Sequence, residues 1–222
     1  MSVGQTIDKP HEMRPTAMAK AFGSQRESGG FDEIPFAERF SMLVDDEWDS
    51  RRVNKRISLL KTARFSAPEA NVADIRYDGD RGLDKSQILE LSDCGWVKAK
   101  RSIVITGASG AGKTWIACAL GVAACSSFHS ARYARLPEMI DELVAERDEE
   151  WLTAKKKHIK CDVLIIDDWL LEAARAKGAR EILEIVESRQ RQRSSILCSQ
   201  FALSAWHPKF GEGAIADAVI DR

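Results

Sequence analysis

The sequence contains one run of residues whose types and spacing suit the binding of phosphate. Gly107-Ala-Ser-Gly-Ala-Gly-Lys-Thr114 matches the pattern G-x-x-x-x-G-K-[ST]. Glycines let the backbone curl until successive N–H groups point inward, and a helix that follows adds the partial positive charge of its N-terminus. Lys113 can reach the β- and γ-phosphates of a nucleoside triphosphate, and the Thr114 hydroxyl can complete the ligand shell of Mg²⁺. The run therefore predicts a nucleoside-triphosphate site.

The residues on both sides of this run fit such a site. Ser102–Thr106 is an apolar run typical of a buried strand, and residues 115–120 have the pattern of a helix. A chance glycine-rich turn that opens a helix is the alternative, but it explains neither the strand nor the Lys-Thr pair. The residues expected to line the phosphate cradle are Gly107, Ala108, Ser109, Gly110, Ala111, Gly112, Lys113, Thr114 and Trp115.

Two adjacent carboxylates follow a second apolar run, Val163–Ile166. Parallel sheets bind ligands at the carboxyl ends of their strands, and acids buried there need a cation. Asp167 is therefore predicted to hold Mg²⁺, directly or through water. Asp168 is predicted to polarise the attacking water as a general base. The alternative is that the pair caps the following helix.

Polar residues also follow the strand predicted at Ser194–Ser199. If this strand lies beside the one that carries Asp167, Ser199 and Gln200 can contact the γ-phosphate or orient the water. Serine and glutamine are common in loops, so the position alone does not decide their role.

Strand and helix patterns alternate after residue 68, which predicts an α/β domain with a parallel sheet and helices on both faces. Ala67-Pro68 and the turn signals near residue 80 place a boundary there. We expect a flexible segment over 1–30, a helical domain over 31–68 and the ATPase domain over 69–222. The strands are predicted at Ser102–Thr106, Ala131–Leu136, Val163–Asp167 and Ser194–Ser199.

The N-terminal part carries a block of basic residues. The apolar spacing after Pro35 predicts one helix, and a second is predicted from Val44 to Arg64. No acidic residue occurs in residues 51–64. Two interpretations of this basic block remain open: a solvated helix face, or a surface that binds DNA phosphates. The residues of this candidate DNA surface are Arg51, Arg52, Lys55 and Arg56. Secondary basic patches are predicted at Lys155–Lys157 and at Arg189, Arg191 and Arg193.

Composition fits a soluble, cytoplasmic globular protein. Of the 222 residues, 44% are hydrophobic and 30% are charged, and no segment reaches the roughly 20 apolar residues of a membrane span. The N-terminus has no secretory signal pattern. Five cysteines without a C-x-x-C pair predict core residues rather than a zinc site or a disulfide framework.

These residues together resemble the IstB family of transposition helper ATPases, which group with DnaC-like helicase loaders in the AAA+ class. The resemblance runs from about Arg14 to Arg222. The phosphate-binding motifs identify only a superfamily. The similarity to IstB in particular lies in Phe36-Ala-Glu-Arg, Asp46-Glu-Trp and the basic helix.

The resemblance implies an ATP- and Mg²⁺-dependent homo-oligomer that assembles on double-stranded DNA and stimulates a partner transposase of an insertion sequence. It implies ATP binding by Lys113 and Thr114, a γ-phosphate sensor at Ser199 or Gln200, and an arginine finger at Arg222. This chain has Asp168 where many relatives have glutamate, which implies slower hydrolysis, and Leu170 where glycine often stands. Family members also continue with a further strand beyond Arg222, so we expect the edge strand of the sheet to be absent.

Three other functions remain open at this point. A DnaC-like loader of a replicative helicase would share the ATPase core and differ mainly in its N-terminal domain. A metabolic phosphotransferase would need an acceptor site, and none is recognisable. An ATP-binding scaffold that never hydrolyses is also compatible with the shorter Asp168.

Overall fold

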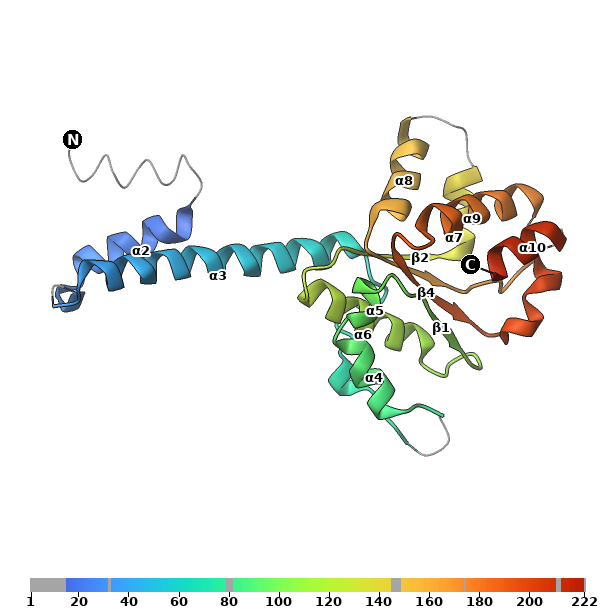
Figure 1. The fold of residues 1–222 in the computed structure, drawn as a ribbon, viewed down its shortest axis with the longest axis horizontal. Coiled ribbons are helices and arrows are strands. Elements are labelled where there is room, and N and C mark those ends of the chain that lie inside the picture. The colour runs from blue at the N-terminus through green and yellow to red at the C-terminus, as the bar shows by residue number, and fades with distance from the viewer. Residues whose placement is uncertain are drawn as a thin grey trace. The chain divides into compact units, whose positions relative to one another are not determined.

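The structure, a computed structural model, describes residues 15–31, 33–78, 82–144, 149–173, 175–210 and 213–221. The chain divides into two compact units, Met1–Ser58 and Leu59–Arg222. Figure 1 labels most of their α-helices and strands. The elements of the first unit are α2 (Thr16–Glu27), η1 (Gly29–Phe31) and most of α3 (Phe36–Ala63), which continues into the second. Those of the second are η2 (Val72–Asp74), α4 (Lys85–Ser92), α5 (Gly95–Lys98), β1 (Ile103–Thr106), α6 (Lys113–Ser126), β2 (Ala131–Arg135), α7 (Leu136–Val144), α8 (Glu149–Lys160), β3 (Val163–Asp167), α9 (Ala176–Arg189), β4 (Ser194–Ser199), η3 (Leu203–Ala205), η4 (His207–Lys209) and α10 (Gly213–Ile220).

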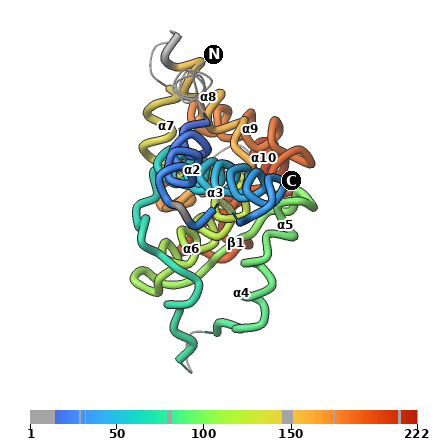
Figure 2. Tube along the Cα trace, turned by 90° about the vertical axis from the view of Figure 1, so that its left-hand side faces the viewer, coloured from blue at the N-terminus to red at the C-terminus, as the bar shows by residue number. Residues whose placement is uncertain are grey.

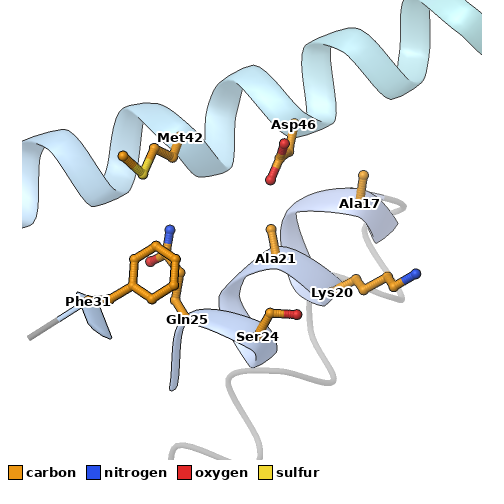
Figure 3. A pocket seen from close by; sticks show the side chains of 8 residues that line it. All are labelled: Ala17, Lys20, Ala21, Ser24, Gln25, Phe31, Met42 and Asp46. Atoms are coloured by element: carbon orange, nitrogen blue, oxygen red, sulfur yellow. The ribbon is translucent and has the colours of Figure 1, made fainter. Parts of the chain in front are cut away.

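Among its described residues, the first unit has two α-helices in an arrangement that differs from the one predicted from the sequence. A single helix, α3, covers the residues for which two helices were predicted, because no proline or glycine interrupts Phe36–Ala63. Helix α2 forms within the segment 1–30 that was expected to be flexible. Residues of α2 and α3 line a cavity of about 550 Å³. Figure 3 shows Met42 and Asp46 of α3 facing residues of α2 there.

Glu47 of α3 joins these two helices. Its Oε2 accepts hydrogen bonds from the backbone N–H groups of Ala17 and Met18 at 3.0 and 3.2 Å. These groups lie in the first turn of α2, where N–H groups have no partner within the helix. The Glu47 carboxylate therefore caps α2 from a distant part of the chain.

The second unit confirms the predicted α/β fold. The four strands in its described residues are parallel and lie in the order β1-β4-β3-β2. β3 is central and fully buried, so its run of Val, Leu and Ile reads as continuously apolar. β1 is an edge strand, so the expectation of a buried strand there is wrong: Val104 is 42% exposed.

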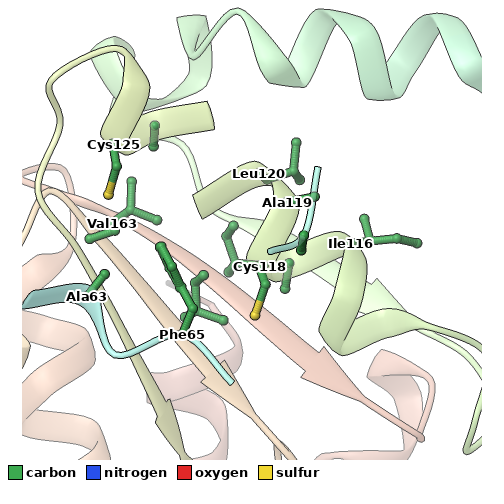
Figure 4. Close-up of a cluster of buried hydrophobic side chains, with 14 of the residues drawn as sticks. Ala63, Phe65, Ile116, Cys118, Ala119, Leu120, Cys125 and Val163 are labelled. Carbon is green, nitrogen blue, oxygen red and sulfur yellow. The ribbon is translucent and has the colours of Figure 1, made fainter. Parts of the chain in front are cut away.

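Helices cover both faces of the sheet, as predicted. One core lies under α6, and Figure 4 shows Cys118 and Cys125 of this helix pointing toward the strands. The other core joins the opposite face to α7, α9 and α10. Figure 2 separates the two layers, with α7, α9 and α10 in its upper half and α4 and α6 in its lower half.

Gly121 permits the close approach of α6 to the sheet. A Cβ atom at this position would lie 2.6 Å from Cε1 of Phe65 and 2.8 Å from Cδ1 of Ile165. Phe65 belongs to the segment that leaves α3, and Arg64 before it has a φ of 55°, a left-handed conformation that ends the helix. Gly121 and Phe65 therefore fix the start of this segment against the core.

Candidate nucleotide site

The predicted phosphate cradle lies between β1 and α6. Gly110 and Gly112 have φ values of 75° and 86°, which glycine adopts without steric cost. Gly112 precedes α6, and no side chain caps the first N–H groups of that helix. Lys113 Nζ donates to the carbonyl oxygens of Gly107 and Ala108, both at 2.8 Å. The loop thus curls around Lys113. The N-terminus of α6, which has no side-chain cap from Gly112, suits the binding of an anion.

Asp167 lies at the end of β3, beside the first turn of α6. The Thr114 hydroxyl donates to Asp167 Oδ2 at 2.6 Å, and Tyr133 Oη donates to the same oxygen at 2.9 Å. The backbone N–H of Asp168 donates to Oδ1 at 2.9 Å. Asp167 is 6% exposed, and its carboxylate has donors on both oxygens.

The donor set fits Mg²⁺ in combination with a nucleotide. Thr114 and Asp167 supply hard oxygen ligands of the kind that Mg²⁺ prefers. Within the described ranges, no group of three or more His, Cys, Asp or Glu side chains could hold a metal. Mg²⁺ at this site would therefore take its remaining ligands from phosphates and water, as is usual for this ion.

Asp168 is held by a residue that the sequence analysis did not single out. Arg135, at the end of β2, contacts Asp168 Oδ2 through Nε at 2.9 Å and through Nη2 at 2.8 Å. Arg135 also pairs with Glu138, and the hydrogen bond and charge of Asp168 are the main cause of a raised pKa of its guanidinium. One carboxylate oxygen of the predicted general base, Oδ2, is thus paired with the Arg135 guanidinium.

The backbone around Asp168 is left-handed at two positions. Asp168 and Leu170 have φ values of 53° and 54°. Aspartate tolerates this region, whereas for a leucine it costs roughly 1–2 kcal/mol. Leu170 is fully buried in the core, and this burial offsets the strain. The loop therefore adopts a glycine-like geometry without a glycine.

One cavity of about 430 Å³ gathers most of the predicted site. Its lining residues are Ser66, Ala67, Ser109, Gly110, Gly112, Lys113, Thr114, Trp115, Asp167, Asp168, Cys198 and Gln200. Ser199 is not among them: its hydroxyl is buried and donates to the carbonyl of Trp169 at 3.0 Å. Of the two sensor candidates, Gln200 is therefore the one that faces the cavity. Arg222 lies outside the described residues.

Sequence reasoning missed the contributions of β2 and of the segment after α3. Tyr133 and Arg135 alternate along a predicted strand, which places both side chains on one face. That alternation was the available signal, but the sequence does not state which strand lies beside β3. Ser66 and Ala67 gave no signal, because they are small residues in an irregular segment.

The four predicted DNA-contacting residues are exposed on α3, within the first unit. They are not equivalent, because Arg51 Nε contacts Glu47 Oε1 at 2.7 Å. The Arg52 guanidinium lies 5.9 Å from the centre of the Trp48 ring. Arg51 thus belongs to the contact that joins α2 to α3.

The predicted secondary basic patches are only partly exposed. Lys155 is buried and pairs with Glu181 and Glu184 at 2.8 and 2.7 Å. Arg189 is buried, whereas Arg191 is exposed and Arg193 pairs with Asp162 at 2.8 Å. Lys155 and Arg189 are therefore structural residues, and the interpretation of them as DNA contacts is wrong.

All five cysteines are buried and unpaired, as predicted for core residues. Burial is the main cause of a raised pKa at each thiol, which keeps the thiols protonated and unreactive.

Comparison with known proteins identifies the family. The family described as IstB-like ATP binding protein matches residues 9–222. The chain belongs to this family. An insertion sequence ATP-binding protein of Sinorhizobium fredii is 35% identical over 221 residues, which cover 98% of this chain and 89% of that protein. The ATP-binding protein of insertion sequence IS1162 of Pseudomonas fluorescens is 33% identical over 92% of this chain and 89% of its own length.

Solved structures share the α/β fold of this family member. DnaI matches with a TM-score of 0.60 and 18% identity, over 74% of this chain and 87% of that one. The DnaC helicase loader matches with a TM-score of 0.53 and 16% identity, over 69% of this chain and 90% of that one. These likenesses concern the fold alone. In the part of the chain that the structure describes, no helix has the length and apolar content of a membrane span.

Proposed function

We propose that this protein is a Mg²⁺-dependent ATPase that assembles on double-stranded DNA in the cytoplasm and stimulates the transposase of the same insertion sequence. The observation that carries the ATPase part is the 2.6 Å contact between Thr114 and Asp167 beside Lys113, in one cavity at the carboxyl edge of a parallel sheet. Relatives named as insertion sequence ATP-binding proteins support the link to transposition.

In the proposed reaction, each residue of the site has a separate task. Lys113 exchanges its two carbonyl partners for phosphate oxygens, to which an ammonium binds more strongly. Thr114 and Asp167 hold Mg²⁺, which neutralises phosphate charge when bound. Asp168 takes the proton of the attacking water, and Gln200 orients that water or the γ-phosphate. Arg135 must first release Asp168 Oδ2, so the basal rate is expected to be slow.

Substitution of Lys113 and Asp168 tests the ATPase proposal. Lys113→Ala should abolish ATP binding and leave the far-UV circular dichroism unchanged, because its ammonium contacts the carbonyls of the loop rather than the core. Asp168→Asn should bind ATP and lose turnover, because an amide cannot accept the proton. Undiminished hydrolysis by Asp168→Asn would remove this residue from the reaction. Binding without hydrolysis in the native protein, with and without DNA, would instead support an ATP-binding scaffold.

The DNA proposal rests on Arg52, Lys55 and Arg56, which are exposed on one helix. Phosphate contacts position a protein without reading bases, so we expect little sequence preference. If each residue neutralises one phosphate, the triple alanine variant should flatten the slope of log affinity against log salt by about 2.7. Arg51 is left intact because Glu47 needs it to hold α2.

A matched control is available on α8, where Lys156, Lys157 and Lys160 are also exposed. Their triple alanine variant removes the same charge and should leave the slope unchanged. A flattened slope in the α8 variant alone would place the DNA surface on α8 and contradict the proposal for α3.

Assembly and the partner are tested with a transposase of the same insertion sequence. We expect ATP- and DNA-dependent oligomers by electron microscopy, and stimulation of strand transfer that Lys113→Ala abolishes. The proposed role of Arg222 requires it to act in the site of a neighbouring subunit, so mixing Arg222→Ala with Lys113→Ala should restore part of the ATPase activity. Stimulation of a replicative helicase instead of the transposase would favour the loader function.

A further inference from the structure

Tyr133 presents its hydroxyl to the carboxylate that is proposed to hold the metal. β2 pairs with β3 in a register that sets Tyr133 beside Ile165 and Arg135 beside Asp167. The Tyr133 ring is half-buried, and its hydroxyl lies 2.9 Å from Asp167 Oδ2. An ordinary phenol has a pKa of about 10 and is protonated at neutral pH, so the Tyr133 hydroxyl is a donor to this carboxylate.

The same oxygen of Asp167 also accepts from Thr114, at 2.6 Å. A hydroxyl has one donor hydrogen and two acceptor lone pairs, so Thr114 can donate to Asp167 while a lone pair faces the cation. Thr114 lines the cavity and can serve both groups, whereas Tyr133 is not among the lining residues and contacts the carboxylate. Together with the Asp168 N–H on Oδ1, the Tyr133 hydroxyl is therefore placed to fix the orientation of the Asp167 carboxylate.

Tyr133 has a polar neighbour in the segment that follows α3. Burial is the main cause of a raised pKa of the Tyr133 phenol, and the Ser66 hydroxyl is near enough to lower this pKa in part. The Ser66 hydroxyl also lies 3.6 Å from the thiol of Cys118. Its neighbour Phe65 fills the space beside Gly121, so the backbone at Ser66 has little freedom to move. Ser66 therefore lies next to the hydroxyl that contacts Asp167.

We propose that Tyr133 is a positioning residue that orients Asp167 toward the Mg²⁺ of a bound nucleotide, and that Ser66 orients Tyr133. The inference rests on the proposed function of the site. A phenylalanine would fill the same space but could not donate to the carboxylate. Asp167 would then turn more freely, and the metal would have to order it at a cost in affinity.

The test compares Tyr133→Phe with Tyr77→Phe, because Tyr77 is the other of the two tyrosines and its ring lies near Lys85 instead. Binding of a fluorescent ATP analogue is titrated in EDTA and at increasing Mg²⁺, without any measurement of turnover. Tyr133→Phe should bind the analogue in EDTA as the native protein does. Its half-saturating Mg²⁺ concentration should rise by roughly 10-fold or more, the usual effect of removing a partner of a metal ligand.

Ser66→Ala should shift the half-saturating Mg²⁺ concentration in the same direction by a smaller factor, and it also tests the inference if Tyr133→Phe does not fold. Tyr77→Phe should leave the Mg²⁺ titration unchanged. Native dependence on Mg²⁺ in both Tyr133→Phe and Ser66→Ala would overturn the positioning role and leave the ATPase proposal intact. Absence of any Mg²⁺ effect in the native protein would overturn the ATPase proposal as well.

Discussion

Arg189 offers a sharp test of how buried charge stabilises this fold. It is the last residue of α9 and is 2% exposed. Its Nη1 donates to the carbonyl oxygens of His158, Ile159 and Cys161 at 2.8, 3.1 and 2.9 Å, and its Nη2 donates to that of Ser194. The carbonyls at the end of a helix have no partners within it, so one guanidinium closes the end of α8 and ties it to β4.

Arg189→Ala leaves these four carbonyl oxygens without their donor. An unpaired buried acceptor costs about 1–3 kcal/mol, and water that enters the vacated space will recover part of that. We therefore expect a loss of about 3–5 kcal/mol, a large share of the ~5–15 kcal/mol that stabilises a native protein. At about 2–4 °C per kcal/mol for a domain of this size, the melting temperature should fall by roughly 6–20 °C.

The assay is urea denaturation followed by circular dichroism, with Arg191→Ala as the matched control. Arg191 is the same residue type two positions later, and it is exposed. Its removal should change the unfolding free energy by no more than about 0.5 kcal/mol. A difference below about 1 kcal/mol between the two variants would refute the claim that Arg189 acts as a structural cap. At temperatures where it is folded, Arg189→Ala should bind DNA as the native protein does.

Two further predictions concern packing and the restraint on the general base. Gly121→Ala should destabilise the fold by about 1–3 kcal/mol through the clash with Phe65, which outweighs the ~1 kcal/mol gain in helix propensity. Gly95→Ala, where a new Cβ meets nothing within 4 Å, should be neutral or stabilising in the same urea titration. Arg135→Gln should raise the basal rate of ATP hydrolysis because it frees Asp168 Oδ2, and this is measured as phosphate release at saturating ATP. A lower rate would mean that Arg135 assists the reaction instead of restraining it.

Features that depend on neighbouring residues were predictable from the sequence. Glycines at 110 and 112 determine the turn of the cradle, and the strands Val163–Asp167 and Ser194–Ser199 were predicted with the bounds that the structure has. Such features follow from backbone conformation and from short apolar runs, which a window of a few residues contains.

Only the tertiary structure decided which side chains meet. Tyr133 and Arg135 reach the acid pair because β2 pairs with β3 from more than 30 positions away along the chain, as the separations of 34 and 33 show. The sequence presents Arg189 and Arg191 as one basic run, yet one is buried as a cap and the other is exposed. Burial and long-range pairing depend on how the whole chain packs. Local composition therefore determined the presence of the site, and strand order determined the residues that orient it.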